Sequence, residues 1–418
     1  MKTEIKQWLF LALGVILVTG YTHAQTFEWT MKGNPLGQQV NGVAFRADGQ
    51  KVVSGTNCHP ASIRMFDVAT SQLNWDFNVG MNYMCIMGVT FSSNSNYISA
   101  IEEFGNIFIF DNTGSLPVIS DTILTGSPFA FCTAISPSND RVAVGGSDGR
   151  LRVYSLPGGA LMLNILAHPL AWVTSVSFSP NGNRILTGSA NNQVRIWNST
   201  TGSLVHTCTG HSDDVTSVKV TPNGNFVVSG SRDNTLRIWN LNTGGFVRSI
   251  TGHSDDVNGV DVSPDGTRVV SASSDATCKI WDFNTGNLVS TFGVVDSGAV
   301  LTVAWAPVGN KIVTGNIRSD VTLWNASSAL GIEASRESDG DLTIYPNPAV
   351  DFITIQIPQS TKQGSLRILN ELGQSVQELI YSDDFLLKVP VNSLVNRVYF
   401  VEFLTENKKS ISKLVINR

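Results

Sequence analysis

Short stretches in which every second residue is apolar recur along most of the chain. Three consecutive copies of the pattern end at Trp197, Trp239 and Trp281, with a spacing of 42 residues between one tryptophan and the next. Alternation with a period of two is typical of a β-strand with one buried face. Each copy contains about four such runs, separated by turn residues. The pattern therefore predicts an array of small β-sheets.

A turn signal follows the first run of these three copies, as Asn181-Gly182, Asn223-Gly224 and Asp265-Gly266. Both central residues of a tight type I′ turn need positive φ, which Asn, Asp and Gly tolerate best, so we expect type I′ hairpins here. A four-stranded sheet of about 40 residues cannot cover both of its own apolar faces. Neighbouring sheets must therefore stack, and a closed ring of them is a β-propeller.

One large aromatic residue marks the same position of every repeat, at spacings of 42 to 44 residues. Their number predicts seven sheets, or blades. The run Phe27–Met31 resembles Leu73–Phe77, the expected outer strand of blade one, whereas no outer strand follows Trp324 in blade seven. We infer that the N-terminal strand completes blade seven and closes the ring. The aromatic positions are Phe66, Phe110, Tyr154, Trp197, Trp239, Trp281 and Trp324.

The two ends of the chain depart from this repeat. Residues 1–24 join Lys2 and Lys6 to an apolar run and a small-residue cleavage site, as a secretory signal peptide does. The run is too short to span a membrane, so we expect export and no transmembrane helix in the mature protein. The propeller is expected over residues 25–330 and a polar linker over 331–340. Residues 341–418 contain about seven short strand patterns, which predict a small Ig-like β-sandwich and an all-β chain.

Composition narrows the classes of function. The 418 residues are 42% hydrophobic and 15% charged, and the net charge of −5 gives no indication of a nucleic-acid partner. The five cysteines predict neither a disulfide framework nor a zinc site, although one disulfide pair stays open in an exported protein. We expect no metal and no cofactor. The cysteines are Cys58, Cys85, Cys132, Cys208 and Cys278.

Gly210-His211 and Gly252-His253 precede a first strand, Trp-Asn or Trp-Asp closes the third strand, and an Asp lies six residues before the Trp. On these residues the stretch 26–328 resembles the WD-repeat (WD40) family. In that family a buried relay of His, Ser or Thr, Asp and Trp ties each blade together. The resemblance implies this relay in blades five, six and four, at His211, Ser229, Asp233 and Trp239, at His253, Ser271, Asp275 and Trp281, and at His168, Thr187 and Trp197.

The other blades depart from the family pattern. In blade four Asn191 replaces the Asp, and blade three keeps only Asp148. Phe66, Phe110 and Arg318 occupy key positions of blades one, two and seven. We therefore expect those blades to depend on apolar packing alone.

The recurrence of the polar residues bears on catalysis. His, Ser and Asp could form a hydrolase triad, but a catalytic site would occur once, whereas these residues recur at the same phase. Gly145–Gly149 fits a G-x-S-x-G nucleophile elbow, yet a strand follows it where that motif needs a helix. Asp213-Asp214 and Asp255-Asp256 also repeat in register, which favours solvated loop residues. We expect no catalytic residues.

The loops before the first strand and after the second gather at one end of the disc, the usual partner-binding end in WD-repeat proteins. Arg232, Asp214 and Asp256 are the candidate partner-binding residues there. The resemblance implies a non-enzymatic interaction scaffold for a protein, a peptide or a glycan. The alternatives are a propeller hydrolase or lyase acting on extracellular polymers from the central channel, and a structural component of secretion or adhesion machinery.

The C-terminal segment, residues 341–418, has a motif of its own, with Tyr345, Pro346, Asn347, Pro348, Gly373 and Lys413 among its positions. On these residues the segment resembles the C-terminal sorting domain of the type IX (Por) secretion system, found in certain Gram-negative bacteria, although Arg397 replaces the usual Gly. The alternative is an ordinary Ig-like adhesion module. The resemblance implies that the type IX machinery is a partner, and that the protein passes through the periplasm to be secreted or held on the outer cell surface.

Overall fold

The computed structural model describes residues 26–31, 39–57, 61–78, 85–293 and 298–326, and a further set of strands between residues 343 and 415. The chain divides into two compact units, Met1–Asn325 and Ala326–Arg418. The predicted signal peptide and the predicted linker lie outside the described residues. Every regular element in the described residues is a β-strand, and none of these residues belongs to a helix that could span a membrane. The all-β prediction is confirmed.

The described residues of the first unit form seven four-stranded antiparallel sheets. Successive strands along the chain run from the innermost to the outermost position of a sheet. The sheets of blades one to four are β2 (Val40–Phe45), β3 (Lys51–Thr56), β4 (Ser62–Asp67) and β5 (Leu73–Asn78); β6 (Ile86–Phe91), β7 (Tyr97–Glu102), β8 (Asn106–Asp111) and β9 (Val118–Leu124); β10 (Ala130–Ile135), β11 (Arg141–Gly146), β12 (Arg150–Ser155) and β13 (Leu161–Leu166); and β14 (Val173–Phe178), β15 (Arg184–Ser189), β16 (Gln193–Asn198) and β17 (Leu204–Thr209).

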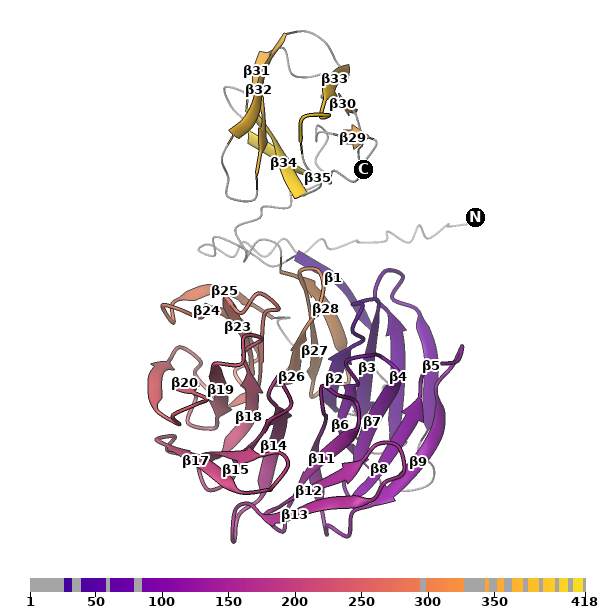
Figure 1. Cartoon of the computed structure of the whole chain (residues 1–418), viewed down its shortest axis with the longest axis vertical. Helices are drawn as coiled ribbons and strands as arrows, with labels where there is room; N and C mark the ends of the chain where they lie inside the picture. Colours follow the sequence, from indigo (N-terminus) through magenta and orange to yellow (C-terminus); the bar gives the residue numbers. More distant parts are fainter. Residues whose placement is uncertain are drawn as a thin grey trace, which may run out of the picture. The chain divides into compact units, whose positions relative to one another are not determined.

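The remaining sheets complete a closed ring (Figure 1). The innermost strands contact one another in the order β2, β6, β10, β14, β18, β22 and β26, and β26 contacts β2. Blades five to seven are β18 (Val215–Val220), β19 (Phe226–Ser231), β20 (Leu236–Asn240) and β21 (Phe246–Ile250); β22 (Val257–Val262), β23 (Arg268–Ser273), β24 (Cys278–Asp282) and β25 (Leu288–Phe292); and β26 (Val300–Trp305), β27 (Lys311–Asn316), β28 (Val321–Asn325) and β1 (Thr26–Met31).

The N-terminal strand β1 forms the outer strand of blade seven. It pairs antiparallel with β28, with Thr26 opposite Asn325 and Met31 opposite Val321. The hydroxyls of Thr30 and Thr322 lie 3.0 Å apart across this pair. The predicted closure of the ring by Phe27–Met31 is therefore confirmed, and a strand from the start of the unit completes the sheet at its end.

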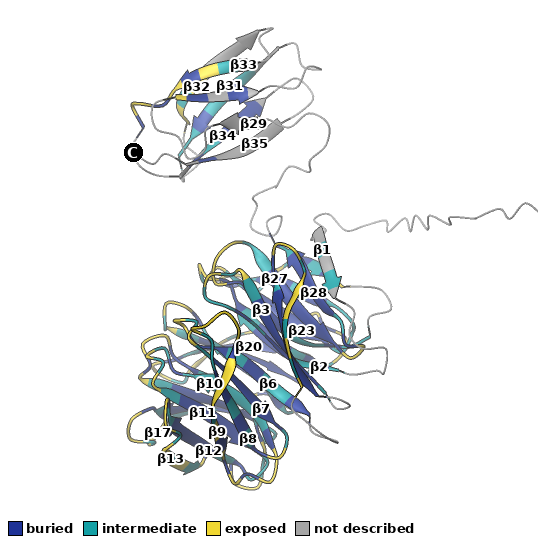
Figure 2. Ribbon diagram, turned by 90° about the vertical axis from the view of Figure 1, so that its right-hand side faces the viewer, coloured by how far each residue is buried: buried dark blue, intermediate teal, exposed yellow. Residues whose placement is uncertain are grey.

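The core of this unit lies between adjacent sheets. Figure 2 shows buried residues along the strands, with exposed residues in the loops and on outer strands such as β13. Trp239, for example, packs in a buried cluster with Leu186 and Val194 of the neighbouring blade four and with Val215 of its own blade. Large aromatic side chains bury more area than any others, which explains why one recurs at this position of each repeat.

The hairpins between first and second strands differ from the type I′ prediction, which is wrong. At Asn181-Gly182 only Gly182 has positive φ, at 71°. The amide oxygen of Asn181 instead accepts hydrogen bonds from the Ser179 hydroxyl at 2.8 Å and from the Asn183 N–H at 3.1 Å. This side-chain contact closes a loop longer than two residues, in which one left-handed residue is enough to reverse the chain.

The second unit contains two antiparallel sheets. Its buried core includes Ile353, Ile355, Leu366, Val401 and Leu414. The Ig-like topology stays a prediction. One sheet consists of β29 (Thr343–Tyr345), β30 (Phe352–Gln356) and β33 (Leu386–Pro390), and the other of β32 (Ser375–Ser382), β31 (Gln363–Leu369), β34 (Val398–Leu404) and β35 (Lys409–Val415).

Residues of the expected sorting motif fall partly within these strands. Tyr345 ends β29, and Lys413 lies within β35. Pro346, Asn347, Pro348 and Gly373 lie outside the described residues.

Candidate functional site

The structure brings the four relay residues of blade five together. Nδ1 of His211 lies 2.7 Å from Oδ2 of Asp233, and Nε2 lies 2.8 Å from the Ser229 hydroxyl. The indole N–H of Trp239 donates to the same hydroxyl at 2.9 Å. These bonds join the loop before β18, strands β19 and β20, and the turn between them, so the network ties one whole blade together.

Blade six repeats this geometry. Nδ1 of His253 lies 2.7 Å from Asp275, and Nε2 lies 2.7 Å from the Ser271 hydroxyl. The indole N–H of Trp281 donates to Ser271 at 2.8 Å. The predicted set of residues is therefore close together here as well.

Blade four keeps the same contacts although Asn191 replaces the Asp. Nδ1 of His168 lies 3.1 Å from the amide oxygen of Asn191, and Nε2 lies 2.8 Å from the Thr187 hydroxyl. Trp197 donates to Thr187 at 3.0 Å. A carboxamide oxygen accepts the imidazole N–H as a carboxylate does, but it carries no charge.

The expectation that blade seven depends on apolar packing alone is wrong. The indole N–H of Trp324 donates to the Thr314 hydroxyl at 3.0 Å, so this blade keeps the Thr and Trp part of the relay. Thr314 precedes Trp324 by ten residues, as Thr187 precedes Trp197. That spacing is the sequence signal that would have found it.

The relay residues are closed to solvent. The side chains of His211 and His253 have 0% exposure. Burial raises the pKa of Asp233, but hydrogen bonds from His211, Thr235 and Ser212 outweigh it and hold the pKa well below its usual range. A nucleophile whose hydroxyl is bonded to both an imidazole and an indole inside a packed blade has no room for a substrate. This geometry favours a structural role.

Replacement of His211 by alanine should lower stability by about 1–3 kcal/mol, because Ser229 and the Asp233 carboxylate lose a buried partner. Thermal unfolding of the purified full chain measures the loss. The matched control is His206→Ala, because His206 lies on the outer strand β17 and contacts a backbone carbonyl, that of Asn242. Unchanged stability of His211→Ala together with lost partner binding would assign His211 to a binding site instead.

The end of the propeller is built on one repeated position, which we call the pre-strand position: the residue immediately before the innermost strand. Its backbone carbonyl accepts an N–H from the turn between the second and third strands in all seven blades, at 2.7 to 3.0 Å. The backbone is thus constant, whereas the side chain changes from blade to blade. The pre-strand residues are Gln39, Cys85, Phe129, Trp172, Asp214, Asp256 and Ala299.

Aromatic side chains occupy this position in blades three and four. Phe129 is 46% exposed and Trp172 is 52% exposed. Ring contacts extend the cluster, with Phe104 centred 6.0 Å from Phe129 and Phe131 centred 5.3 Å from Trp172. We call these four residues the aromatic patch. The sequence interpretation missed these residues, although aligning the residue before each first strand would have shown Phe129 and Trp172 beside the Asp of the next two blades.

The three predicted partner-binding residues lie together. Nη1 of Arg232 is 3.1 Å from Asp214, and its Nε is 3.8 Å from Asp256, so the guanidinium bridges blades five and six. Burial raises the pKa of Asp256, and the carboxylates of Asp255, Asp213 and Asp214 add to the rise. We call these four aspartates the acidic patch.

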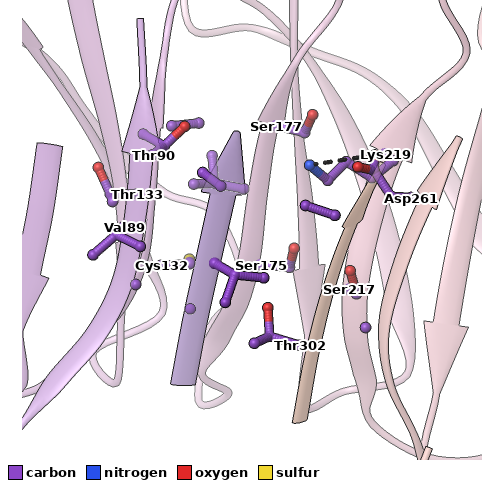
Figure 3. Close-up of a pocket in the computed structure, with 18 of the residues that line it drawn as sticks. Val89, Thr90, Cys132, Thr133, Ser175, Ser177, Ser217, Lys219, Asp261 and Thr302 are labelled. Atoms are coloured by element: carbon purple, nitrogen blue, oxygen red, sulfur yellow. Dashed lines mark ion pairs between the residues drawn. The ribbon is translucent and has the colours of Figure 1, made fainter. Parts of the chain in front are cut away.

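A cavity of about 470 Å³ lies between the innermost strands of all seven blades. Figure 3 shows hydroxyl groups around it, among them those of Thr90 and Ser175. Lys219 and Asp261 are the charged residues in its lining, and they lie 3.6 Å apart. Both oxygens of Asp261 also accept backbone N–H groups, of Val262 and Trp305.

The structure describes four of the five cysteines. Cys85 is disulfide-bonded, so the alternative of a disulfide pair holds, and Cys58 lies outside the described residues. Cys132, Cys208 and Cys278 are free thiols, and burial raises the pKa of Cys132 to about 12. Across the part of the chain that the structure describes, no three His, Cys, Asp or Glu side chains are grouped as a metal site.

Two family models match the chain. The one described as "WD domain, G-beta repeat" matches residues 120–155, 160–198, 202–240 and 244–282. The one described as "Secretion system C-terminal sorting domain" matches residues 343–417. The chain carries WD40 repeats and a sorting domain. The comparison with curated proteins found no match.

The WD40 repeats are offset from the sheets by one strand. The match at residues 160–198 contains β13, the outer strand of blade three, and then β14, β15 and β16 of blade four. Each matched repeat therefore supplies the outer strand of one blade and the three inner strands of the next. β1 fits this arrangement, because it is the outer strand of blade seven and precedes the inner strands of blade one in the chain. The sorting domain indicates export by type IX secretion to the cell surface or the extracellular space.

Proposed function

We propose that this protein is a non-enzymatic scaffold that binds a partner protein through the pre-strand end of its propeller after export. The exposed aromatic pair Phe129 and Trp172 carries the proposal. Both lie on the rigid backbone of the pre-strand position, where their side chains are not needed for the hydrogen bond that the position makes. Exposed apolar clusters of this kind mark interaction sites, and Trp is enriched among the residues that dominate binding energy.

The geometry of the relay residues and of the central cavity argues against catalysis at either place. The relay imidazoles are buried, and the Ser229 hydroxyl that His211 contacts also accepts the Trp239 indole N–H inside the packed blade, so a substrate cannot reach either group. In the cavity, Asp261 accepts two backbone N–H groups and pairs with Lys219, and none of the other lining residues in the described part of the chain is an Asp, Glu or His that could act as a second acid or base.

The route of export is the second part of the proposal. A signal peptide at residues 1–24 would carry the chain into the periplasm of a Gram-negative bacterium, and the sorting domain would present it to the type IX machinery. The WD40 propeller is then the cargo that acts outside the cell, either released or held on the outer surface.

Trp172→Ala should weaken capture of the native partner by at least about tenfold, because a half-buried Trp at an interface centre contributes about 2 kcal/mol or more. The full chain is cross-linked on producing cells and the co-purifying protein is quantified. Leu161→Ala is the matched control, since Leu161 is 53% exposed but lies on the outer strand β13. Equal capture by wild type and Trp172→Ala would contradict the proposal, as would a partner lost only with Leu161→Ala.

A further inference from the structure

We infer that the partner presents a basic peptide segment with apolar anchors, which lies across the aromatic patch and the acidic patch at once. This inference rests on the proposed function, because it names the chemistry of the partner that the pre-strand end binds.

The aromatic patch and the acidic patch lie on consecutive blades. Blades three to six are consecutive, and their innermost strands β10, β14, β18 and β22 contact one another in that order. Their pre-strand residues are Phe129, Trp172, Asp214 and Asp256. Since the same backbone hydrogen bond fixes each of these residues, their side chains start from equivalent points of adjacent blades. One half of this arc is therefore aromatic, and the other half is acidic.

The aromatic half differs from the acidic half at the bulge of the innermost strand. In blades four and five the bulged residue is Thr174 or Thr216, whose hydroxyls donate to the carbonyls of Val215 and Val257 in the next blade. In blade three the bulged residue is Phe131, whose ring lies against Trp172, and the Val173 carbonyl accepts the thiol of the neighbouring Cys132 at 3.7 Å. An aromatic pair thus lies at this junction between blades, and Trp172 is half exposed.

The acidic half has more negative charge than its own cation balances. The Arg232 guanidinium lies within 4 Å of Asp214 and Asp256, whereas Asp213 and Asp255, the preceding residues in the chain, form no ion pair with any described residue. Asp213 and Asp255 are exposed. Burial raises the pKa of Asp214, and the Asp213 carboxylate adds to the rise. A cationic side chain brought by a partner would relieve this repulsion, whereas a phosphate or a carboxylate would increase it.

This combination favours a peptide over a glycan. A neutral sugar could stack on Phe129 and Trp172, but it would gain nothing from four carboxylates. Lysine and arginine side chains supply both the charge and an apolar stem, so a basic segment with Trp or Leu anchors uses both halves of the arc. Electrostatic attraction of this kind weakens as salt is added.

The test uses synthetic peptides of equal length against the full chain. One peptide joins a Trp-Leu pair to a run of lysines, the second joins the same pair to glutamates, and the third keeps the lysines but replaces Trp-Leu by serines. Fluorescence anisotropy should give the first peptide at least about tenfold tighter binding than either of the others. Trp172→Ala and Phe129→Ala should each remove most of that advantage, while Leu161→Ala should not. Circular dichroism checks that each variant is folded.

Arg232→Ala tests whether the Arg232 side chain weakens or strengthens binding of the lysine peptide. Removing this guanidinium releases two carboxylates, so the lysine peptide should bind about threefold more tightly. If Arg232 itself recognised the partner, the substitution would weaken binding, and the inference would be overturned.

The outcomes separate this inference from the proposed function. If capture of the native partner depends on Trp172 but the full chain prefers the glutamate peptide, or a neutral oligosaccharide displaces the lysine peptide, the scaffold function stands and the basic-peptide inference is wrong. If native capture is independent of Trp172 as well, the proposed function itself fails. Tight, salt-sensitive binding of the lysine peptide that Trp172→Ala abolishes supports both.

Discussion

Deletion of residues 26–31 is expected to leave the propeller open and prone to self-association. These residues form β1, which supplies five residue pairs to β28. Without them the backbone groups of β28 that face β1 lose their partners, and an unpaired edge strand is a template for pairing with another chain. The lost ladder and its packing should reduce stability on the order of 5 kcal/mol, a large share of what a folded domain has.

Size-exclusion chromatography and thermal unfolding of the purified variant measure this effect. The control is Glu28→Gln, which keeps the strand and removes only its ion pair with Lys311. Both side chains of that pair are partly exposed, so the pair should be worth no more than about 1 kcal/mol. A deletion variant that remains monomeric and melts with the wild type would show that β1 does not close the ring.

The ring closure was predictable from the sequence because the repeat has a fixed period. A pattern with four strands per copy leaves one strand missing at one end, and Phe27–Met31 resembles the strand that is missing. The relay in blades five and six was predictable for the same reason, since its residues recur at equal spacing. Because each blade corresponds to one repeat, residues that meet in space also recur at a fixed spacing along the chain.

What the repetition does not contain could not be predicted. The contact between Phe131 and Trp172 joins residues of adjacent blades, and no other pair of adjacent blades has two aromatic residues at these positions. The hairpin at Asn181-Gly182 was predicted wrongly because hydrogen bonds accepted by the Asn181 side chain decided the loop, and a dipeptide pattern does not include them. In both cases the deciding contact is made by side chains, and the alternation of apolar and polar residues does not encode it.

Acidification from pH 7 to pH 4 is expected to destabilise the propeller mainly through His168. Burial, reinforced by the charge of Arg195, lowers the pKa of His168 from 6.5 to about 4, and the Asn191 contact opposes this only weakly. In the unfolded chain His168 binds a proton near pH 6.5, whereas in the folded chain it does so near pH 4. The stability that this difference provides is full above pH 6.5 and is lost as the pH falls towards 4, by about 3 kcal/mol in all.

The three relays allow this effect to be isolated by exchanging one side chain. Asn191→Asp gives blade four the His and Asp pair of blade five, and a carboxylate beside His168 raises the pKa of that imidazole. This variant should therefore lose little stability between pH 6.5 and pH 4, whereas the reciprocal variant, Asp233→Asn, should lose more than wild type, because His211 would gain the surroundings of His168. Urea unfolding at several pH values measures both slopes, and the titrating groups that the substitutions leave in place cancel in the comparison. Parallel slopes for wild type and Asn191→Asp would show that His168 is not the group responsible, and an unchanged slope for Asp233→Asn would show that the carboxylate of blade five has no such influence on its histidine.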